Sequence, residues 1–332
     1  MSLITKYGSF WGMIPQTTGR YFFVAPSASY TVEGVAYDAS NDNDGLSPER
    51  AKRTVAGAIS AASASVGDVI VLLPGSHSVS ATITISKAGL TIVGIPGSTP
   101  SSNMRHGSGG KRLRTQITST ETAGIIFTVS APDTEIAYIH FAPPAAGGQG
   151  ISLTPTVNVA NRPYIHDCTF ALIATASVTT YGINVPAGVT ADVLESALIS
   201  RCYFVSGLVA SSGANGPAVN VLGTAHNLTI ENSSFELRGT AAWADVILSS
   251  NPGTLGLKVA DCDFNTPTLT TTVMTDVIDI TGQTVDGSLQ CYRCYFPEGS
   301  DAFQITATPD GIAAECYTAF STAASNVALG VA

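Results

Sequence analysis

The sequence has few charged residues. They make up 12% of its 332 residues, and only 15 of them are lysine or arginine. With a net charge of −9, the chain lacks the clustered positive charge that binds nucleic acid. It also lacks an apolar run of 18 residues and the N-terminal pattern of a signal peptide, so we expect neither a membrane-spanning helix nor export through the Sec pathway. A surface this poor in charge is unusual for a free monomer, so we expect burial in an oligomer or a larger particle.

Recurring pairs of amphipathic helices, as in TPR or HEAT arrays, are also missing, and a different repeat takes their place. An apolar residue is followed three positions later by a small or apolar residue and two positions after that by Phe, about once every thirty residues. The copies end at Phe141, Phe170, Phe204, Phe235, Phe264 and Phe296. Units this small cannot bury their own apolar faces, so the repeat predicts a solenoid.

The spacing inside each unit is typical of strands. Apolar and polar residues alternate, as in Leu228-x-Ile230, and Val, Ile and Thr dominate. A two-residue step then predicts a corner, with pairs such as His166-Asp167 and Ser200-Arg201 turned outward. A second strand recurs between the Phe motifs, as in Ile183-x-Val185. We therefore predict an all-β fold, a parallel β-helix of roughly eight or nine rungs and on the order of 40 Å in length.

The six cysteines fall in the same register. Cys291 takes the place of an Ile or Val, and the small-residue column holds Cys168, Cys202, Cys262, Cys294 and, by continuation, Cys316. Thiols at such positions behave as small apolar side chains, and neighbours in one column have parallel side chains that suit disulfide geometry poorly. We expect reduced cysteines, which indicates assembly in a reducing cytoplasm. We expect no metal site, because the five histidines do not cluster by sequence or by column either.

The N-terminal third is organised differently. A strand at Tyr21–Val24 and a turn at Asn41–Gly45 precede Ser47-Pro48-Glu49, which predicts the start of an amphipathic helix of about 16 residues that ends near Gly67. Its apolar face consists of Ala51, Val55, Ile59 and Ala62. Because a solenoid leaves unpaired apolar core at its end, we expect this helix to cap it.

The acidic turn before that helix has a second interpretation. Asp42, Asp44 and Gly45, with Asp38 upstream, resemble the start of a calcium-binding loop. A loop with Gly45 at its sixth position has Ala51 at its twelfth, where an EF-hand needs a bidentate Glu. The sequence therefore favours a plain turn that leads into the helix.

Residues 21–94 hold a run of architectural motifs: a Phe-Val-x-Pro-Ser strand, an Asp-Gly-Leu-Ser-Pro turn, the capping helix, a Gly-Asp-Val-Ile-Val-Leu-Leu-Pro-Gly strand and an Ile-x-Ile-x-x-x-Gly-Leu-Thr-Ile-Val-Gly rung. This opening resembles that of pectate-lyase-like right-handed β-helix proteins, in particular bacteriophage virion proteins such as tailspikes and related fibres. The resemblance implies right-handed coiling, frequent trimers and an N-terminal segment that attaches to the particle.

Three regions follow from this resemblance and from the repeat. We expect an attachment or packing segment at residues 1–20, a leading strand, turn and capping helix at 21–67, and the β-helix rungs at 68–332. The first segment has an alternative, a simple flap on the first rung. A basic loop, Arg105 to Arg114, is either a flexible element that docks on an acidic neighbour or phosphate, or a solvated insertion between rungs.

If the protein is an enzyme, the relevant reaction is glycan cleavage. It would be catalysed either by two carboxylates that face one groove or by a base beside a bound cation. The candidate acids are Asp245, Asp276 and Asp279, with Asp301 nearby and Trp243 as a platform for a sugar ring. Acids on adjacent rungs would lie about 5 Å apart and acids on alternate rungs about 10 Å apart, which suits either stereochemical course. The Asp-Asp and Gly-His-Gly motifs of polygalacturonases are absent, so the sequence leans against catalysis and indicates no cofactor.

The outward corner column offers a structural use for charge. It runs through Asp167, Arg201, Asn232, Asp261, Arg293 and Glu315. Alternating signs on stacked rungs would disfavour register slips, although each exposed pair contributes only about 0–1 kcal/mol. A glycan-binding ridge is the functional alternative for the same column.

The sequence therefore predicts a phage virion structural protein, a rigid β-helical spike, fibre or capsid-surface decoration. We expect a homotrimer that is made in the host cytoplasm, resides in the virion and contacts other capsid or tail proteins. Two alternatives stay open: a tailspike depolymerase that cleaves a host surface polysaccharide, and a noncatalytic adhesin that binds a host surface glycan. The sequence leaves open whether the protein belongs to the head or to the tail.

Overall fold

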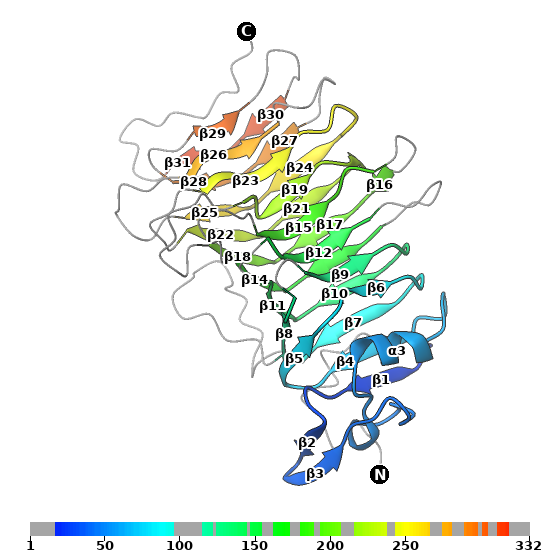
Figure 1. Ribbon diagram of the computed structural model, residues 1–332. Coiled ribbons are helices and arrows are strands. Elements are labelled where there is room, and N and C mark those ends of the chain that lie inside the picture. Colours follow the sequence, from blue (N-terminus) through cyan, green and yellow to red (C-terminus); the bar gives the residue numbers. More distant parts are fainter. Residues whose placement is uncertain are drawn as a thin grey trace.

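The chain forms a ladder of parallel strands that winds upward from its N-terminal end (Figure 1). The computed structural model describes residues 17–95, 115–121, 124–144, 147–154, 162–172, 180–188, 193–206, 216–237, 243–265, 274–280, 289–297, 301–304 and 311–318. Within these ranges, the side chains of 244, 275–276, 301–304, 311–314 and 317–318 lie outside the description. None of the described helices is long and apolar enough to cross a membrane.

Three parallel sheets form the sides of the ladder. The first sheet consists of β1 (Tyr21–Val24), β4 (Val69–Leu72), β7 (Thr91–Gly94), β10 (Glu135–Ala137), β13 (Tyr164–His166), β17 (Leu198–Ser200), β21 (Thr229–Glu231), β24 (Leu257–Ala260), β27 (Leu289–Tyr292) and β30 (Gly311–Ala314). The second consists of β5 (Gly75–Val79), β8 (Thr115–Ser119), β11 (His140–Ala142), β14 (Thr169–Leu172), β18 (Tyr203–Ser206), β22 (Ser234–Leu237), β25 (Asp263–Asn265), β28 (Tyr295–Phe296) and β31 (Tyr317–Thr318). The third consists of β6 (Ile83–Ile85), β9 (Ile125–Val129), β12 (Gln149–Leu153), β15 (Tyr181–Val185), β19 (Val219–Val221), β23 (Trp243–Ser249), β26 (Met274–Asp279) and β29 (Asp301–Gln304).

The register between rungs follows the sequence repeat. In the first sheet, the central residue of each strand pairs with its equivalent in the next strand, as Ile136 does with Ile165 and Ile165 with Ile199. The predicted all-β parallel β-helix is therefore confirmed. The first sheet has ten described strands. Nine of them, from β4 to β30, lie within residues 68–332, in agreement with the eight or nine rungs expected, and β1 adds a further strand below them.

A column of phenylalanine rings fills the core. Successive rings from Phe141 to Phe296 stack nearly parallel, with centroids 4.7–5.2 Å apart and interplanar angles of 9° or less. This spacing matches the distance between adjacent strands, about 4.8 Å, so each rung adds one ring directly above the last. Phe127 meets the lower end of the column edge-on, at 5.6 Å from Phe141.

The corner between the first and second sheets also repeats. Its residue adopts a positive φ on seven rungs: Tyr138, Asp167, Arg201, Asn232, Asp261, Arg293 and Glu315. The left-handed conformation turns the chain sharply, so that the next residue points back into the core. The following position holds the predicted small-residue column, and all six cysteines are free and buried, as the register predicts.

The capping helix is shorter than predicted and starts later. A 3-10 turn, η1 (Pro48–Arg50), is followed by extended residues, and the helix α3 (Val55–Ala61) has only seven residues. Its N-cap is Thr54, whose hydroxyl accepts a hydrogen bond from the Gly57 N–H at 3.0 Å, whereas Ser47 makes no side-chain cap. The expected helix of about 16 residues starting at Ser47 is therefore wrong.

The interruption has a physical reason in strand β1, at the edge of the first sheet. The Lys52 N–H donates to the Phe23 carbonyl at 2.8 Å, and the Ala25 N–H donates to the Lys52 carbonyl at 3.0 Å. Extended pairing thus satisfies backbone groups that a strand edge would otherwise leave open. The helix still acts as a lid: it lies beside β1 and β4 at the N-terminal end of the solenoid (Figure 1), and its Val55 and Ile59 join the same apolar core as the strands.

Other N-terminal predictions have mixed outcomes. The acidic turn is held by internal contacts: Asp44 accepts from the Leu46 N–H at 3.0 Å and pairs with Arg50 at 3.2 Å. A hairpin of β2 (Ser29–Val32) and β3 (Val35–Asp38), which the sequence did not predict, precedes it.

Outside the three main sheets, β16 (Val193–Glu195) and β20 (Thr224–His226) form a short parallel pair beside the middle rungs. Most of the segment 1–20 and all of the basic loop from Arg105 to Arg114 lie outside the described residues.

Candidate functional site

The predicted acids lie on the third sheet. Asp245 in β23 pairs in register with Asp276 in β26, and Asp276 pairs with Asp301 in β29. Their backbones therefore stack at the strand spacing of about 4.8 Å. Asp279 belongs to a different column, between Leu248 and Gln304, and is buried. The structure brings three of the four acids into one backbone column, while the side chains of Asp276 and Asp301 lie outside the description.

Trp243 does not form a platform for a sugar ring. Its side chain is fully buried, and its indole N–H donates to the Gly216 carbonyl at 2.8 Å. It packs with Met274, its register partner on the next strand, in the main core. The expectation that Trp243 contacts a ligand is therefore wrong, because the start of β23 turns this residue into the solenoid.

The most connected polar cluster among the described side chains lies on the outer face of the first sheet. We call it the His166 network, and its members are Thr91, Glu135, His166, Asp167, Ser200, Arg201 and Glu231. In each three-residue strand here the central isoleucine points into the core. The flanking residues consequently face outward, and those of neighbouring strands meet.

His166 is the centre of this network. Its Nε2 lies 2.8 Å from Oε1 of Glu135 on the strand below, and its Nδ1 lies 2.7 Å from Oδ2 of Asp167 at the corner. The ring stacks on Tyr164 with a centroid distance of 4.1 Å, and Tyr138 meets it edge-on at 5.8 Å. Only 9% of the His166 side chain is exposed to solvent, so the imidazole is almost entirely shielded from water.

The two acids determine the charge of this imidazole. Burial lowers the pKa of His166, but hydrogen bonds to Asp167 and Glu135 outweigh burial and raise its pKa above 6.5. The hydrogen bond from His166 lowers the pKa of Glu135. For Asp167, burial raises the pKa, and contacts with His166 and Arg201 more than offset this and lower it. The arrangement is that of an imidazolium between two carboxylates.

Arg201 extends the network to the next rungs. Its Nη2 lies 2.7 Å from Oδ2 of Asp167, and its Nη1 donates to the Ser200 hydroxyl at 3.3 Å. Ser200 in turn donates to Oε1 of Glu231 at 3.2 Å. Arg201 Nη2 also lies 3.2 Å from Nδ1 of His166, a contact between two cationic groups that the carboxylate of Asp167 offsets. The network therefore joins five successive strands, from β7 to β21.

Asp167 and Arg201, which the corner spacing predicts to share one ladder, form an ion pair in the structure. His166 faces outward, as predicted, but its neighbours bury it, which the sequence pattern did not predict. The missed signal was register: Glu135 precedes Ile136 and His166 follows Ile165, so both face outward on adjacent strands, in diagonal contact. Higher up the same corner column, Asp261 and Arg293 form a second ion pair at 2.7 Å.

The chemistry available to the His166 network is limited by its own contacts. The acids and the imidazole hold one another in charged form, so neither acid is a ready proton donor near neutral pH. The described residues contain no group of three or more His, Cys, Asp or Glu that could hold a metal ion. The arrangement is therefore better suited to linking neighbouring rungs through ion pairs and hydrogen bonds than to acid–base catalysis.

Comparison with solved structures supplies the wider context. The chain is similar to a pectin methylesterase solved in complex with a hexasaccharide, with a TM-score of 0.54 and 13% identity over 89% of this chain and 92% of that one. It is also similar to the pectin methylesterase PemA from Erwinia chrysanthemi, with a TM-score of 0.54 and 12% identity over 91% and 90% of the two chains. The chain is a right-handed parallel β-helix. At these identities the likeness shows the fold alone.

A third structure, ORF18 of Geobacillus virus E2, has a TM-score of 0.37 and 15% identity over 79% of this chain and 57% of that one. A TM-score this low supports no argument about function. No family model matches the chain, and no curated protein matches it. The phage virion type that the N-terminal opening resembles therefore stays a prediction.

Proposed function

We propose that the chain is a structural protein of a phage particle, a rigid β-helical spike, fibre or capsid-surface decoration. The observation that carries this proposal is the unbroken column of six stacked phenylalanine rings from Phe141 to Phe296. A core that repeats one close-packed contact per rung resists bending, because any bend must open ring contacts on one side. The phage assignment rests on the resemblance of residues 21–94 to virion proteins.

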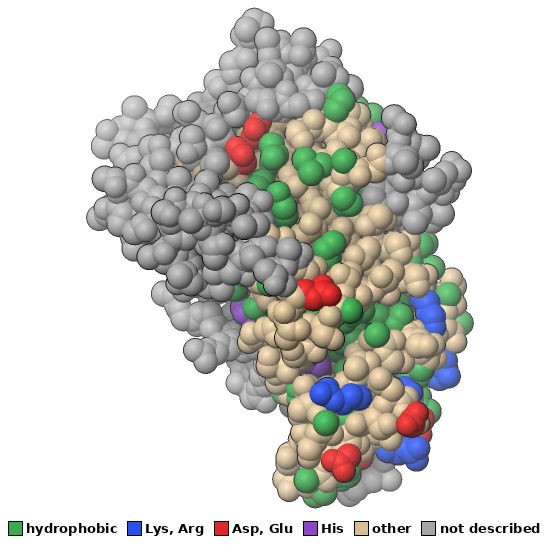
Figure 2. Space-filling model, in the orientation of Figure 1, with side chains coloured by type: hydrophobic (Ala, Val, Ile, Leu, Met, Phe, Trp, Pro, Cys, Tyr) green, Lys and Arg blue, Asp and Glu red, His purple; other side chains and the backbone are tan. Residues whose placement is uncertain are grey.

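The surface supports assembly with partners. On the face drawn in Figure 2, Lys and Arg side chains gather around the N-terminal end, and the stacked strands above it expose mostly uncharged side chains. Charge makes up only 12% of the whole chain. Free monomers normally depend on surface charge for solubility, so we infer a homotrimer that contacts other capsid or tail proteins in the virion after synthesis in the host cytoplasm.

Solution mass and sugar release test this proposal together. Light scattering on the purified full chain should give the mass of a trimer, and the same fractions should release no sugar from host envelope polysaccharide. A trimer without sugar release supports the structural role. Sugar release, or a stable monomer that does not associate with purified virion proteins, would contradict it.

The second candidate is a tailspike depolymerase or a noncatalytic glycan adhesin. The backbone column of Asp245, Asp276 and Asp301 favours it, since acids at that spacing suit glycan cleavage. One similar structure is described as a complex with a hexasaccharide. Asp245→Asn, Asp276→Asn and Asp279→Asn distinguish the two: sugar release that these changes abolish indicates an enzyme, and glycan binding without release indicates an adhesin.

A further inference from the structure

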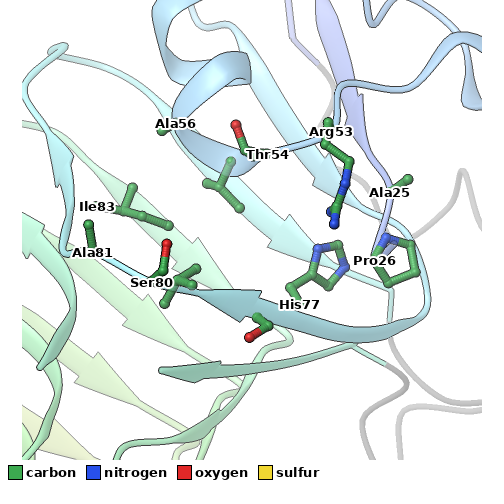
Figure 3. Close-up of a pocket in the computed structure, with 12 residues that line it drawn as sticks. Ala25, Pro26, Arg53, Thr54, Ala56, His77, Ser80, Ala81 and Ile83 are labelled. Atoms are coloured by element: carbon green, nitrogen blue, oxygen red, sulfur yellow. The ribbon is translucent and has the colours of Figure 1, made fainter. Parts of the chain in front are cut away.

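A pocket of about 180 Å³ opens where the start of α3 faces strand β5 and the turn that follows it (Figure 3). Its polar lining includes Arg53, His77 and Ser80, beside Thr54 and Ser78, and its apolar lining includes Pro26 and Ile83. In Figure 3 the guanidinium of Arg53 and the ring of His77 point toward each other. The pocket is separate from the His166 network, from the acid column of the third sheet and from the corner ladder.

His77 presents an acceptor in this pocket. Its side chain is buried, and its Nε2 lies 2.8 Å from the Leu73 carbonyl oxygen. A carbonyl only accepts, so Nε2 carries the proton. Burial and the nearby charge of Arg53 lower the pKa of His77, so the ring is neutral near pH 7 and Nδ1 carries a lone pair. A ligand group that pairs with Nδ1 must therefore be a donor, such as a hydroxyl.

Among the described residues, Arg53 presents a cation without a counter-ion. Within the described part of the chain its side chain is half-buried and makes no ion pair or side-chain hydrogen bond. Arg50, three residues earlier, is more exposed and pairs with Asp44 at 3.2 Å. A partly desolvated guanidinium without an anion is unfavourable, and its planar group pairs with a carboxylate or a phosphate through two parallel hydrogen bonds.

We propose that this pocket binds a ligand that carries a carboxylate beside a hydroxyl group, the combination found in an acidic sugar. The carboxylate pairs with Arg53, and the neighbouring hydroxyl donates to Nδ1 of His77. Ser80, which also lines the pocket, offers a further hydroxyl, and Pro26 and Ile83 contact the C–H face of the ligand. Inorganic phosphate also pairs with Arg53 and carries a hydroxyl proton, but it has no C–H face for Pro26 and Ile83 to contact. The assignment does not depend on the structural role proposed above.

Calorimetry with the full chain tests the proposal, with glucuronate as the probe and glucose, acetate and inorganic phosphate as comparisons. We expect glucuronate to bind, and the other three to bind at least about tenfold more weakly. Arg53→Gln should weaken glucuronate binding by at least about tenfold. The matched control, Arg50→Gln, should bind like the parent chain, because Arg50 is an exposed arginine outside the pocket lining.

Each contrary outcome has a definite meaning. Absence of glucuronate binding at millimolar concentrations, or equal losses in the Arg53 and Arg50 variants, overturns the proposal. Phosphate that binds as tightly as glucuronate and depends on Arg53 also overturns it, in favour of a simple anion site. His77→Gln keeps a polar group with less disturbance than an apolar substitution, and it should reduce the preference for glucuronate over acetate. Thermal unfolding of every variant establishes that it is folded before its binding is compared.

Discussion

Two columns run along the solenoid, one inside and one at the outer corner, and only the inner one is uniform. From Phe141 to Phe296 the phenylalanine rings repeat with the same identity and nearly the same spacing on successive rungs. The corner residue, in contrast, changes type repeatedly while keeping a positive φ. A core position must match its neighbours in shape, whereas a corner position must only tolerate a left-handed backbone and remain polar or solvated.

Backbone hydrogen bonds explain the tolerance of the corner. The N–H of Asp167 donates to the Ser200 carbonyl at 3.1 Å, and that of Arg201 donates to the Glu231 carbonyl at 3.1 Å. The same contact recurs at Asn232 and Asp261. Each rung thus holds the next through main-chain atoms, and the side chains are free to differ. Because the side chains differ, Asp167 and Arg201 belong to the His166 network, whereas Asp261 and Arg293 form a more exposed ion pair.

The largest effect should come from the inner column. Phe204→Ala removes a ring that lies between Phe170 and Phe235, and should destabilise the chain by about 3–5 kcal/mol. Urea unfolding measures the change. Tyr295→Ala, an exposed aromatic beside the same column, is the control and should cost far less. A loss below about 1 kcal/mol for Phe204→Ala would mean that neighbouring rings close the gap.

A smaller effect is expected within the His166 network. Asp167→Asn keeps the shape of the side chain but leaves His166 and Arg201 without the charge that separates them. Because Asp167 is mostly buried while Arg201 is partly exposed, we expect a loss of about 2 kcal/mol. Urea unfolding near neutral pH measures it. An unchanged midpoint would show that solvent screens this pair as fully as an exposed one.

The pH dependence of the network should be smaller again. The raised pKa of His166 stabilises the fold below its unfolded value of 6.5, and this contribution is lost as pH rises through the folded pKa. Glu135 and Asp167 have lowered pKa values, so each stabilises the fold above its usual pKa, 4.5 for Glu135 and 3.8 for Asp167. This stabilisation is lost as the pH falls through their folded pKa values. The network therefore contributes most between pH 4.5 and 6.5.

His166→Gln tests this dependence. We expect the urea midpoint of the variant to fall further below that of the parent chain at about pH 5.5 than at about pH 8.5. His140, whose pKa burial lowers, supplies the control. The difference in urea midpoint between His140→Gln and the parent chain should not increase as the pH falls from about 8.5 to about 5.5. Equal differences at both pH values for His166→Gln would indicate that the ring acts by packing on Tyr164 alone.

The contrast between the columns also explains what the sequence could predict. A uniform column leaves a repeat, so the Phe pattern was enough to predict the parallel β-helix, its register and the burial of Cys291 in an isoleucine position. The capping helix was harder, because its apolar spacing did not reveal that Lys52 pairs with β1. Tertiary pairing of an open strand edge outweighed helix propensity there.

The candidate site was less predictable, because its contacts depend on diagonal neighbours across strands. Asp245 and Asp276 could be placed on adjacent rungs from spacing, but the inward turn of Trp243 could not, since β23 is longer than β19 and β15 below it. The contact between Glu135 and His166 required the register of two three-residue strands. The pocket around Arg53 and His77 joins segments whose packing depends on the short helix, which the sequence misplaced.

The smallest effect is expected at the exposed end of the corner column. Asp261 and Arg293 form an ion pair at 2.7 Å, as close as that of Asp167 and Arg201, but without a buried imidazole beside it. Solvent around Arg293 screens the attraction, and holding two side chains in place opposes it. Asp261→Asn should therefore leave the urea midpoint unchanged, while Asp167→Asn lowers it. If both substitutions lowered the midpoint equally, ion pairing itself, and not burial beside His166, would stabilise the corner column.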